Sequence, residues 1–201
     1  SGTVSSNTYG KGNVYGGNSY YGNASYNAVT VNGSTVTGNT YSNGNVYGGN
    51  TSSGEATYNT VTITGGTISR VYGGNSNLNA TNNTVKVQGG TVGSVTGAYS
   101  SKEANNNTVN VSKGTVGTSA GSYAVVGAAN DGTSSGDPVA SGNSVTVTGT
   151  AQVTGLVIGA RDAYYAAVIT DNTVTIDGRA VVTGDVFGGY GWHKDKTPNR
   201  V

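Results

Sequence analysis

The sequence contains neither cysteine nor methionine, and it has only one histidine, one tryptophan and one phenylalanine among its 201 residues. The single histidine, His193, stands in a charged tail, so neither a Ser-His-Asp arrangement nor a set of metal ligands can be proposed. A chain of this length without either sulfur residue suits an exported surface protein that crosses an oxidising compartment unfolded and later resists oxidation. The same absence is also compatible with the cytosol.

Charged residues are scarce as well. Lys, Arg, Asp and Glu make up 9% of the chain, and the formal net charge is +1. This balance leaves no basic field for nucleic acid or for anionic lipid. No apolar run approaches the roughly 18 residues that spanning a bilayer requires. We therefore expect neither nucleic-acid binding nor membrane contact by this segment itself.

What the chain does contain is one sequence motif repeated about seven times. Each repeat has Asn-x-Val-x-Val, then Gly-Thr-Val or a near equivalent, then Val-Tyr-Gly-Gly or a near equivalent. The two shortest repeats are 24 residues long, and a period in this range indicates a stacked solenoid. The leading asparagines are Asn27, Asn59, Asn83, Asn107, Asn143 and Asn172. The valines that open the third element are Val14, Val46, Val71, Val95, Val125, Val157 and Val186.

Side-chain parity predicts strands for these elements. In residues 59–63, Val61 and Ile63 alternate with threonines, which places the apolar side chains on one face of a strand. Three short strands per repeat and no helical period predict an all-β fold, a parallel β-helix solenoid of about six to seven coils. Right-handed coiling is expected, because parallel crossovers are overwhelmingly right-handed. The first strands should point these residues inward: Val29, Val31, Val61, Ile63, Val85, Val87, Val109, Val111, Val145, Val147, Val174 and Ile176. The second strands should contribute Val4, Val36, Ile68, Val92, Val116, Val153 and Val182. The direction of the residue after each third-element valine stays open.

Repeat length varies at two corners only. Residues 38–45 and 119–123 are inserted between the second and third elements, and residues 129–142 and 161–171 follow the third. A rigid coil with variable corners accounts for this pattern. Both ends of the sequence fall inside a repeat, and no capping repeat is visible. We therefore expect residues 1–201 to form a single β-helix segment of a longer repeat protein.

The leading asparagines recur at the same corner of successive coils. Stacked Asn side chains hydrogen-bond along a column and tolerate the left-handed backbone of a tight turn, so a structural role is predicted in preference to a row of ligand-binding amides. The paired glycines are interpreted in the same way, as corners that need positive φ. No helix N-terminus that could cradle phosphate follows them.

No catalytic residue, metal site or cofactor is predicted. Carbohydrate-cleaving β-helices need two or three carboxylates facing one groove, whereas the nine acidic residues here fall mostly in insertions and at differing positions of the repeat. Asp177 and Asp185 share a coil but belong to different strands or corners of it. The calcium-binding nonapeptide with a recurring Gly-x-Asp is also absent.

Aromatic residues after the third strands are the candidate binding residues. Loops that leave the same corner of every coil can stack into one aromatic-rich edge, and tyrosine offers a large contact area to sugars and proteins at low entropic cost. The alternative is that these rings cover exposed backbone or lie singly on the surface. The candidates are Tyr20, Tyr21, Tyr99, Tyr164, Tyr165, Tyr190 and Trp192.

The repeats resemble a known family. Residues 82–93 read Asn-Asn-Thr-Val-Lys-Val-Gln-Gly-Gly-Thr-Val-Gly, and residues 70–76 read Arg-Val-Tyr-Gly-Gly-Asn-Ser. This style is similar to the passenger repeats of bacterial autotransporters, large adhesins among them, and it extends over essentially the whole chain. The resemblance implies a signal peptide before this region, a translocator barrel after it, and secretion to the outer membrane surface. It also implies a role in cell adhesion and virulence, with a host-cell or bacterial surface protein or glycan as partner, and it offers no catalytic motif. Coils five and six depart from the pattern, with Val-Gly-Ala at 126–128 and Ile-Gly-Ala at 158–160.

Two other functions stay open at this point. One is a polysaccharide-binding or polysaccharide-degrading β-helix. The other is an ice-binding solenoid, which needs a regular outward row of Thr-x-Thr. Residues 60–62 and 173–175 fit such a row, but Ala28, Lys86 and Asn110 interrupt it. An adhesin or a rigid stalk needs a long rod with variable loops, which is what the repeat predicts.

Overall fold

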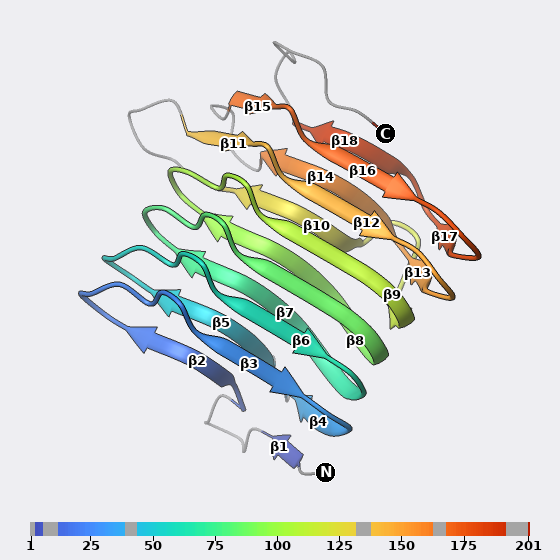
Figure 1. Ribbon diagram of the computed structural model, residues 1–201, viewed down its shortest axis with the longest axis horizontal. Helices are drawn as coiled ribbons and strands as arrows, with labels where there is room; N and C mark the ends of the chain where they lie inside the picture. Colours follow the sequence, from blue (N-terminus) through green and yellow to red (C-terminus); the bar gives the residue numbers. More distant parts are fainter. Residues whose placement is uncertain (1–2, 6–11, 39–43, 132–137, 163–167, 192–200) are drawn as a thin grey trace.

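The computed structural model describes residues 3–5, 12–38, 44–131, 138–162, 168–191 and 201. Within these residues the chain forms strands, turns and bends and contains no helix, which confirms the all-β prediction. The strands stack in coils along one axis, and the two ends of the chain lie at opposite ends of the stack (Figure 1). The handedness of the coiling stays a prediction.

Each coil is built from three strand segments, and corresponding segments of neighbouring coils pair in parallel. The separate first strands are β3 (Ala28–Val31), β6 (Thr60–Ile63), β12 (Ser144–Val147) and β16 (Thr173–Ile176). The separate second strands are β1 (Thr3–Ser5), β4 (Ser34–Thr37), β13 (Gln152–Thr154) and β17 (Val181–Thr183). The separate third strands are β2 (Val14–Ser19), β5 (Asn45–Thr51), β10 (Tyr123–Asn130), β14 (Leu156–Asp162) and β18 (Val186–Tyr190).

In the middle coils the strands continue through the corners. The second and third strands merge in β7 (Gly66–Ser76), all three merge in β8 (Thr84–Ser100), and the first and second merge in β9 (Thr108–Val116). The third strands pair in the order β2-β5-β7-β8-β10-β14-β18, and the first strands in the order β3-β6-β8-β9-β12-β16. These orders give six to seven coils, as the repeat predicts. Two short strands in the insertions, β11 (Val139–Ser141) and β15 (Val168–Thr170), also pair in parallel.

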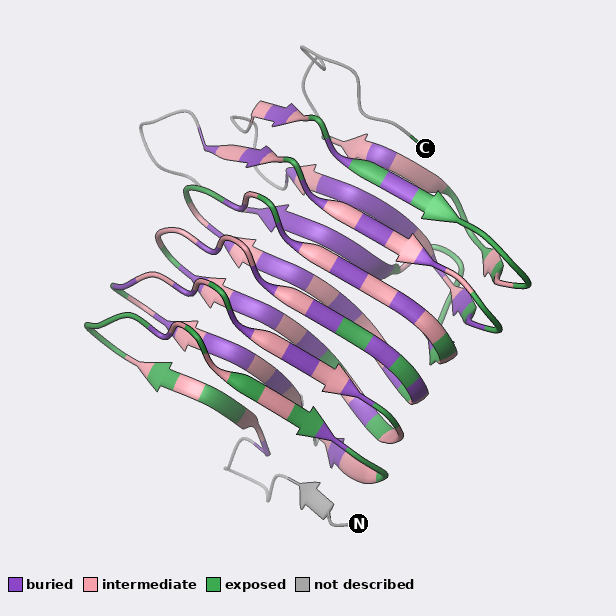
Figure 2. Cartoon of the chain, viewed as in Figure 1, coloured by how far each residue is buried: buried purple, intermediate pink, exposed green. Residues whose placement is uncertain are grey.

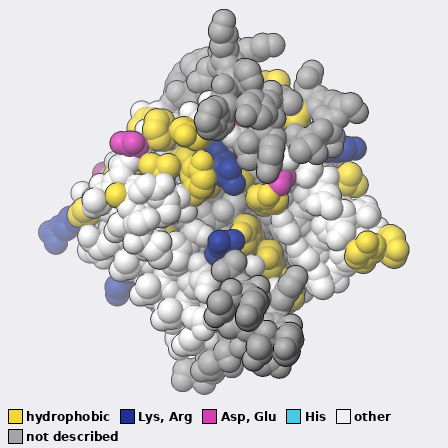
Figure 3. Space-filling model, turned by 180° about the vertical axis from the view of Figure 1, so that it is seen from behind, with side chains coloured by type: hydrophobic (Ala, Val, Ile, Leu, Met, Phe, Trp, Pro, Cys, Tyr) yellow, Lys and Arg dark blue, Asp and Glu magenta, His cyan; other side chains and the backbone are white. Residues whose placement is uncertain are grey.

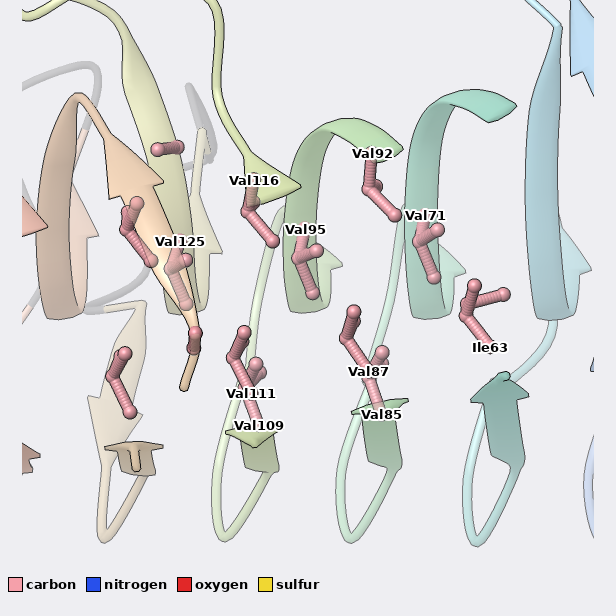
Figure 4. Packing of buried hydrophobic residues seen from close by; sticks show 14 of the residues in the cluster. Ile63, Val71, Val85, Val87, Val92, Val95, Val109, Val111, Val116 and Val125 are labelled. Carbon is pink, nitrogen blue, oxygen red and sulfur yellow. The ribbon is translucent and has the colours of Figure 1, made fainter. Parts of the chain in front are cut away.

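Aliphatic side chains from all three strands fill the interior. In the middle coils Val85 and Val87 from the first strand face Val92 from the second and Val95 from the third, and all four are fully buried (Figure 4). Each fully buried valine stabilises the fold by about 1.5 kcal/mol or more. Successive coils repeat this layer because the residues are in register, so one apolar core runs along the stack.

The inward residues of the end coils are less protected. Ile176 is aligned with the buried Val147, yet its side chain is 37% exposed, so the expected burial of this residue is wrong. Val29, in β3, is only partly buried. Among the described residues β3 pairs only with β6 and β16 only with β12, so one side of each strand has no neighbouring coil. Figure 2 shows the resulting exposure (green) in β3 and β16.

The asparagine column is a buried hydrogen-bonded ladder. In each step the Nδ2 group of one asparagine donates to the Oδ1 atom of the next, as from Asn59 to Asn83 at 2.9 Å and from Asn83 to Asn107 at 3.1 Å. The backbone N–H of Asn59 donates to the same Oδ1 atom of Asn83 at 3.0 Å. From Asn59 to Asn172 these residues are at most 1% exposed, so they are structural and not offered to a ligand. The left-handed backbone, however, belongs to the residue before each asparagine, such as Tyr58 (φ 56°) and Asn82 (φ 57°).

The paired glycines require a different explanation from the predicted one. Gly73 and Gly74 are not among the residues with positive φ. A Cβ atom on Gly74 would lie 2.5 Å from Nδ2 of Asn83, and one on Gly73 would lie 2.4 Å from a neighbouring backbone oxygen. The pair is therefore needed for close approach of the third strand to the asparagine ladder. Positive φ occurs instead at the corner between the first and second strands, as at Gly66 and Gly90.

A fourth repeated element was not predicted. A buried alanine lies at the corner three residues before each of the first five ladder asparagines, as with Ala56, Ala80 and Ala104 at 0% exposure, and Ile169 takes that place before Asn172. Their backbones pair between coils, as in the bonds from Ala56 N to Asn79 O and from Ala80 N to Glu103 O, at 2.9 and 2.8 Å. This corner lets long insertions leave the coil while the ladder beyond it stays in register.

Candidate functional site

The outer face of the third-strand sheet carries two parallel columns of side chains. The residue after each third-element valine points outward and forms the first column: Tyr15, Tyr47, Tyr72, Thr96, Val126, Ile158 and Phe187. Three residues further along each strand lies the second column: Asn18, Asn50, Asn75, Tyr99, Ala129, Arg161 and Tyr190. The sequence left open which way the residue after each third-element valine points, and in the structure its side chain points outward.

In the first three coils these columns are regular ladders. The rings of Tyr15, Tyr47 and Tyr72 stack with centroids 5.1 Å apart and interplanar angles of 6° and 10°. Burial raises the pKa of Tyr47 to about 12, although a hydrogen bond from Asn45 to its hydroxyl at 2.7 Å acts in the opposite direction. Beside the rings, Asn50 donates to Asn18 at 2.7 Å. These contacts connect the outer side chains of the first three coils into two continuous ladders.

Both ladders end at the fourth coil, in β8. Thr96 takes the place of a tyrosine, and Tyr99 takes the place of an asparagine. The ring of Tyr99 meets that of Tyr72 edge-on, with centroids 6.4 Å apart and planes at 85°. Its hydroxyl donates to the Asp131 carboxylate, which also accepts from Ser101 at 3.2 Å. Burial and the hydrogen bond to Asp131 raise the pKa of Tyr99, so its hydroxyl stays protonated as a donor.

From the fifth coil onward the same face is apolar. Val126 and Ile158 from the first column are at most 2% exposed. They form a second hydrophobic cluster, outside the coil, together with Ala129, Leu156, Phe187, Tyr99 and Tyr190. Phe187 and Tyr190 are in contact with ring centroids 5.2 Å apart, and Tyr190 also meets Tyr123 at 6.4 Å.

A groove of about 720 Å³ lies where the ladders meet the apolar half. Its floor contains Tyr72, Thr96 and Val126, which are neighbours in register on β7, β8 and β10. The described residues that line it are Ser69, Arg70, Tyr72, Gly93, Ser94, Thr96, Thr118, Gly121, Ser122, Tyr123, Val126 and Arg161. Figure 3 shows this side of the molecule, with basic side chains near the middle beside hydrophobic ones.

One wall of the groove is the inserted segment 119–123. Ser122 closes a turn by donating its backbone N–H to Ser119 O at 3.1 Å, and its own carbonyl accepts from Leu156 N at 2.8 Å. The turn packs against Gly155, where an added Cβ atom would lie 2.5 Å from Ser122 O. This wall is therefore held against the next coil by backbone contacts.

Two arginines of the groove lie at different positions along the axis of the coil stack. Arg70 is exposed on β7, and Arg161 lies on β14 with its guanidinium 4.5 Å from the ring centroid of Tyr123. The β7 and β14 strands are separated by three steps of the stack, through β8 and β10. At about 4.8 Å per step, the two backbone positions lie about 14 Å apart along the axis.

The predicted binding residues do not form one aromatic edge. Tyr20 and Tyr21 follow β2 in the first coil, are 65% and 82% exposed, and meet each other edge-on at 4.6 Å. Tyr99 and Tyr190 lie within β8 and β18 rather than in loops, and both pack into the outer cluster. The structure thus corrects the expected gathering of these four. Tyr164, Tyr165 and Trp192 lie outside the described residues.

The sequence did not identify several residues of this face. Arg70 occupies the position of Asn13 and Asn45, immediately before the third-element valine, so aligning the repeats would have marked it as a departure. Arg161 similarly replaces an asparagine of the outer ladder. A second exposed pair, Tyr26 and Tyr58, stacks at 5.0 Å just before the ladder asparagines. No signal in the sequence places segment 119–123 over β10.

Acidic and metal-binding residues form no cluster within the part of the chain that is described, which holds no group of three or more His, Cys, Asp or Glu that could bind a metal ion. Asp177 follows β16 and Asp185 precedes β18, so they leave the coil at different corners. Asp162 is buried. In the same described ranges there is no helix with the length and apolar character that crossing a membrane requires.

Comparisons of the chain with protein-family models, with curated proteins and with solved structures found no match.

Proposed function

We propose that this chain is a rigid segment of a surface-displayed adhesin of the autotransporter passenger type, which acts by binding and spacing rather than by chemistry. The observation that carries the proposal is the contrast between interior and exterior. The asparagine ladder and the valine core continue through every coil from Asn59 to Asn172, whereas the outer face changes at the fourth coil from tyrosine and asparagine ladders to an apolar cluster. A stalk needs the first property, and recognition needs the second.

The proposed location is the bacterial cell surface, with the parent protein anchored by an outer-membrane barrel. The passenger-like repeat and the absence of cysteine support this location. The proposed partner is a protein or glycan on a host cell or on another bacterium. The exposed Tyr20–Tyr21 pair and the groove between Arg70 and Arg161 are the surfaces that support a binding role.

Attachment of cells displaying the segment tests the proposal. Replacing Tyr20, Tyr21, Tyr99, Tyr164, Tyr165, Tyr190 and Trp192 together by serine should reduce attachment to host cells or partner bacteria, since each lost aromatic contact is worth about 1 kcal/mol. Tyr26→Ser with Tyr58→Ser is the control, because it removes an exposed stacked pair outside that set. Unchanged attachment in the seven-residue variant would show that these aromatic residues make no adhesive contact.

The groove favours one alternative, a polysaccharide-binding or polysaccharide-degrading β-helix. Its lining of arginine, tyrosine and small hydroxyl side chains suits a sugar chain. Hydrolysis or elimination of a polysaccharide by the purified chain would favour an enzyme. Binding without turnover would agree with an adhesive role.

A further inference from the structure

We propose that the groove over Tyr72, Thr96 and Val126 binds an acidic glycan chain, with Arg70 and Arg161 receiving anionic groups of two separate sugar units. This inference rests on the proposed binding role and names the class of partner. Among the sequence-predicted aromatic residues that the structure describes, none lines this groove.

The groove exists because the tyrosine ladder stops. After Tyr15, Tyr47 and Tyr72, the next residue in the column is Thr96, which lacks the ring that would continue the stack. The following residue, Val126, is buried while segment 119–123 rises beside it as a wall. A missing ring between a flat ladder and a raised wall leaves a hollow that crosses several coils.

The arginines set the charge and the spacing of the ligand. A guanidinium can bind a carboxylate or a sulfate through two parallel hydrogen bonds. Because Arg70 and Arg161 are three steps apart, about 14 Å along the axis, one small anion does not bridge their backbone positions. An extended chain with an anionic group on separate units does. The groove thus selects a polyanionic oligosaccharide over a single anion.

Arg161 is held in place by its surroundings. Its guanidinium lies over the Tyr123 ring at 4.5 Å, a contact that fixes a cation at the edge of the groove. The carboxylate of Asp131, on the same face, accepts hydrogen bonds from Tyr99 and Ser101. That carboxylate is therefore oriented by two hydroxyl groups on the neighbouring coil.

The rest of the lining matches sugar chemistry. Ser94, Thr96 and Ser122 provide hydroxyl groups that can donate to and accept from sugar hydroxyls. Tyr72 and Tyr123 provide rings against which the apolar face of a sugar can pack. The lining residues come from four neighbouring third strands and segment 119–123, so the groove extends over several coils as a chain requires.

An acidic peptide fits the same observations less well. The floor is the face of a sheet whose strands are already paired on both sides, so a peptide strand cannot be added there. Among the lining residues that the structure describes, Val126 is the one aliphatic side chain, and it is buried. The groove therefore lacks the apolar pockets that anchor peptide side chains.

Calorimetric titration of the whole 201-residue chain tests the inference. The probes are a galacturonic acid hexamer for carboxylates, a chondroitin sulfate hexamer for sulfates, maltohexaose as a neutral sugar, and hexaglutamate as an acidic peptide. At least one acidic sugar should bind, and maltohexaose should bind at least about tenfold more weakly. Arg70→Gln and Arg161→Gln should each weaken binding by about tenfold or more.

Three further variants make the result specific. Arg179→Gln removes an exposed arginine on the turn between β16 and β17 and should change affinity less than about twofold. Arg161→Lys keeps a cation at the Tyr123 ring and should retain more affinity than Arg161→Gln. Thr96→Tyr should continue the tyrosine ladder into the hollow and abolish binding while both arginines remain.

The inference is overturned if neither acidic hexamer binds, or if Arg179→Gln weakens binding as much as Arg70→Gln. Equal binding of hexaglutamate with the same arginine dependence would reassign the groove to acidic peptides. Cell attachment of the same variants is measured in a separate experiment. Attachment that depends on the seven aromatic residues but not on the arginines would remove the glycan assignment and leave the adhesive role standing.

Discussion

The two halves of the outer third-strand face differ although they share one register. From β2 to β7 the face is a ladder of tyrosine rings beside a ladder of asparagine amides. From β10 to β18 the same two columns contain Val126, Ile158, Ala129 and Phe187 in an apolar cluster. The groove lies at the junction, on β7, β8 and β10.

The difference shows which positions of a coil are constrained. An inward valine meets the same neighbours in each coil, so the core repeats from Val61 to Val145. An outward residue needs only to match the coils above and below it, so a ladder continues while the residue type repeats and ends where it changes. At β8 Thr96 and Tyr99 interrupt both ladders, and the groove proposed to bind an acidic glycan lies at this interruption.

The largest effect should come from breaking the interior that both halves share. Val85→Asp places a carboxylate in the fully buried core without a partner and should destabilise the protein by more than about 4 kcal/mol. Lys86→Asp, on the exposed side of the same strand, should cost about 1 kcal/mol or less. Thermal unfolding of both variants measures this contrast, and equal shifts would reverse the assigned strand parity.

The stability of the apolar half should depend on its outer hydrophobic cluster. Ile158→Ala removes a fully buried side chain outside the coil and should lower the free energy of unfolding by about 3 kcal/mol. Thr96→Ala, at the same column position on β8, should change it by about 0.5 kcal/mol or less. Urea unfolding of the two variants compares the positions. Similar values would mean that the outer cluster adds no stability.

The buried and exposed asparagine ladders should differ in energy. Asn83→Ala removes the buried Oδ1 acceptor of the Asn59 backbone N–H and of one N–H of its Nδ2 group, whose other N–H still donates to Ala24 O, and this should cost about 2 kcal/mol. Asn75→Ala breaks one bond of the outer ladder, where water can replace the partner, and should cost about 0.5 kcal/mol. Urea unfolding again gives both values, and a larger loss for Asn75→Ala would contradict the structural role of the buried ladder.

The smallest effect concerns the ionisation of the tyrosine ladder. The pKa of Tyr47 is raised to about 12 by burial, whereas an unfolded tyrosine titrates near 10. The unfolded chain therefore loses this proton first, and the stabilisation present below pH 10 should be lost as the pH rises towards 12. Ultraviolet absorbance of tyrosinate, compared with Tyr47→Phe, should show the late titration. A Tyr47 signal near pH 10 would contradict its burial.

Much of the fold follows from the sequence, because parity and period act locally. The alternation in residues 59–63 is enough to place Val61 and Ile63 in the core, and the 24-residue period is enough to stack the coils. The exposure of Ile176 was not predictable from the pattern alone, since it depends on whether a further coil covers β16. The paired glycines were misread because close contact with Asn83 leaves no local signal.

The candidate site was much less predictable. The sequence predicts Tyr99 and Tyr190 as binding residues because they are aromatic, but the structure places both in the outer hydrophobic cluster. The groove forms because Thr96 lacks the aromatic ring of the ladder position and because segment 119–123 packs against Gly155. Contacts between inserted segments and neighbouring coils are set by packing in three dimensions, and no spacing in the chain encodes them.

Amide hydrogen exchange along the buried asparagine ladder tests the central claim, that one continuous interior supports two different outer faces. The N–H groups of Asn59 and Asn83 lie behind the ladder half, and that of Asn143 lies behind the apolar half. Each donates to the Oδ1 atom of the next asparagine at 2.9–3.0 Å. We expect slow exchange at all three positions, with rates within about tenfold of one another because they open together. Slow exchange in one half with fast exchange in the other would contradict a single continuous coil.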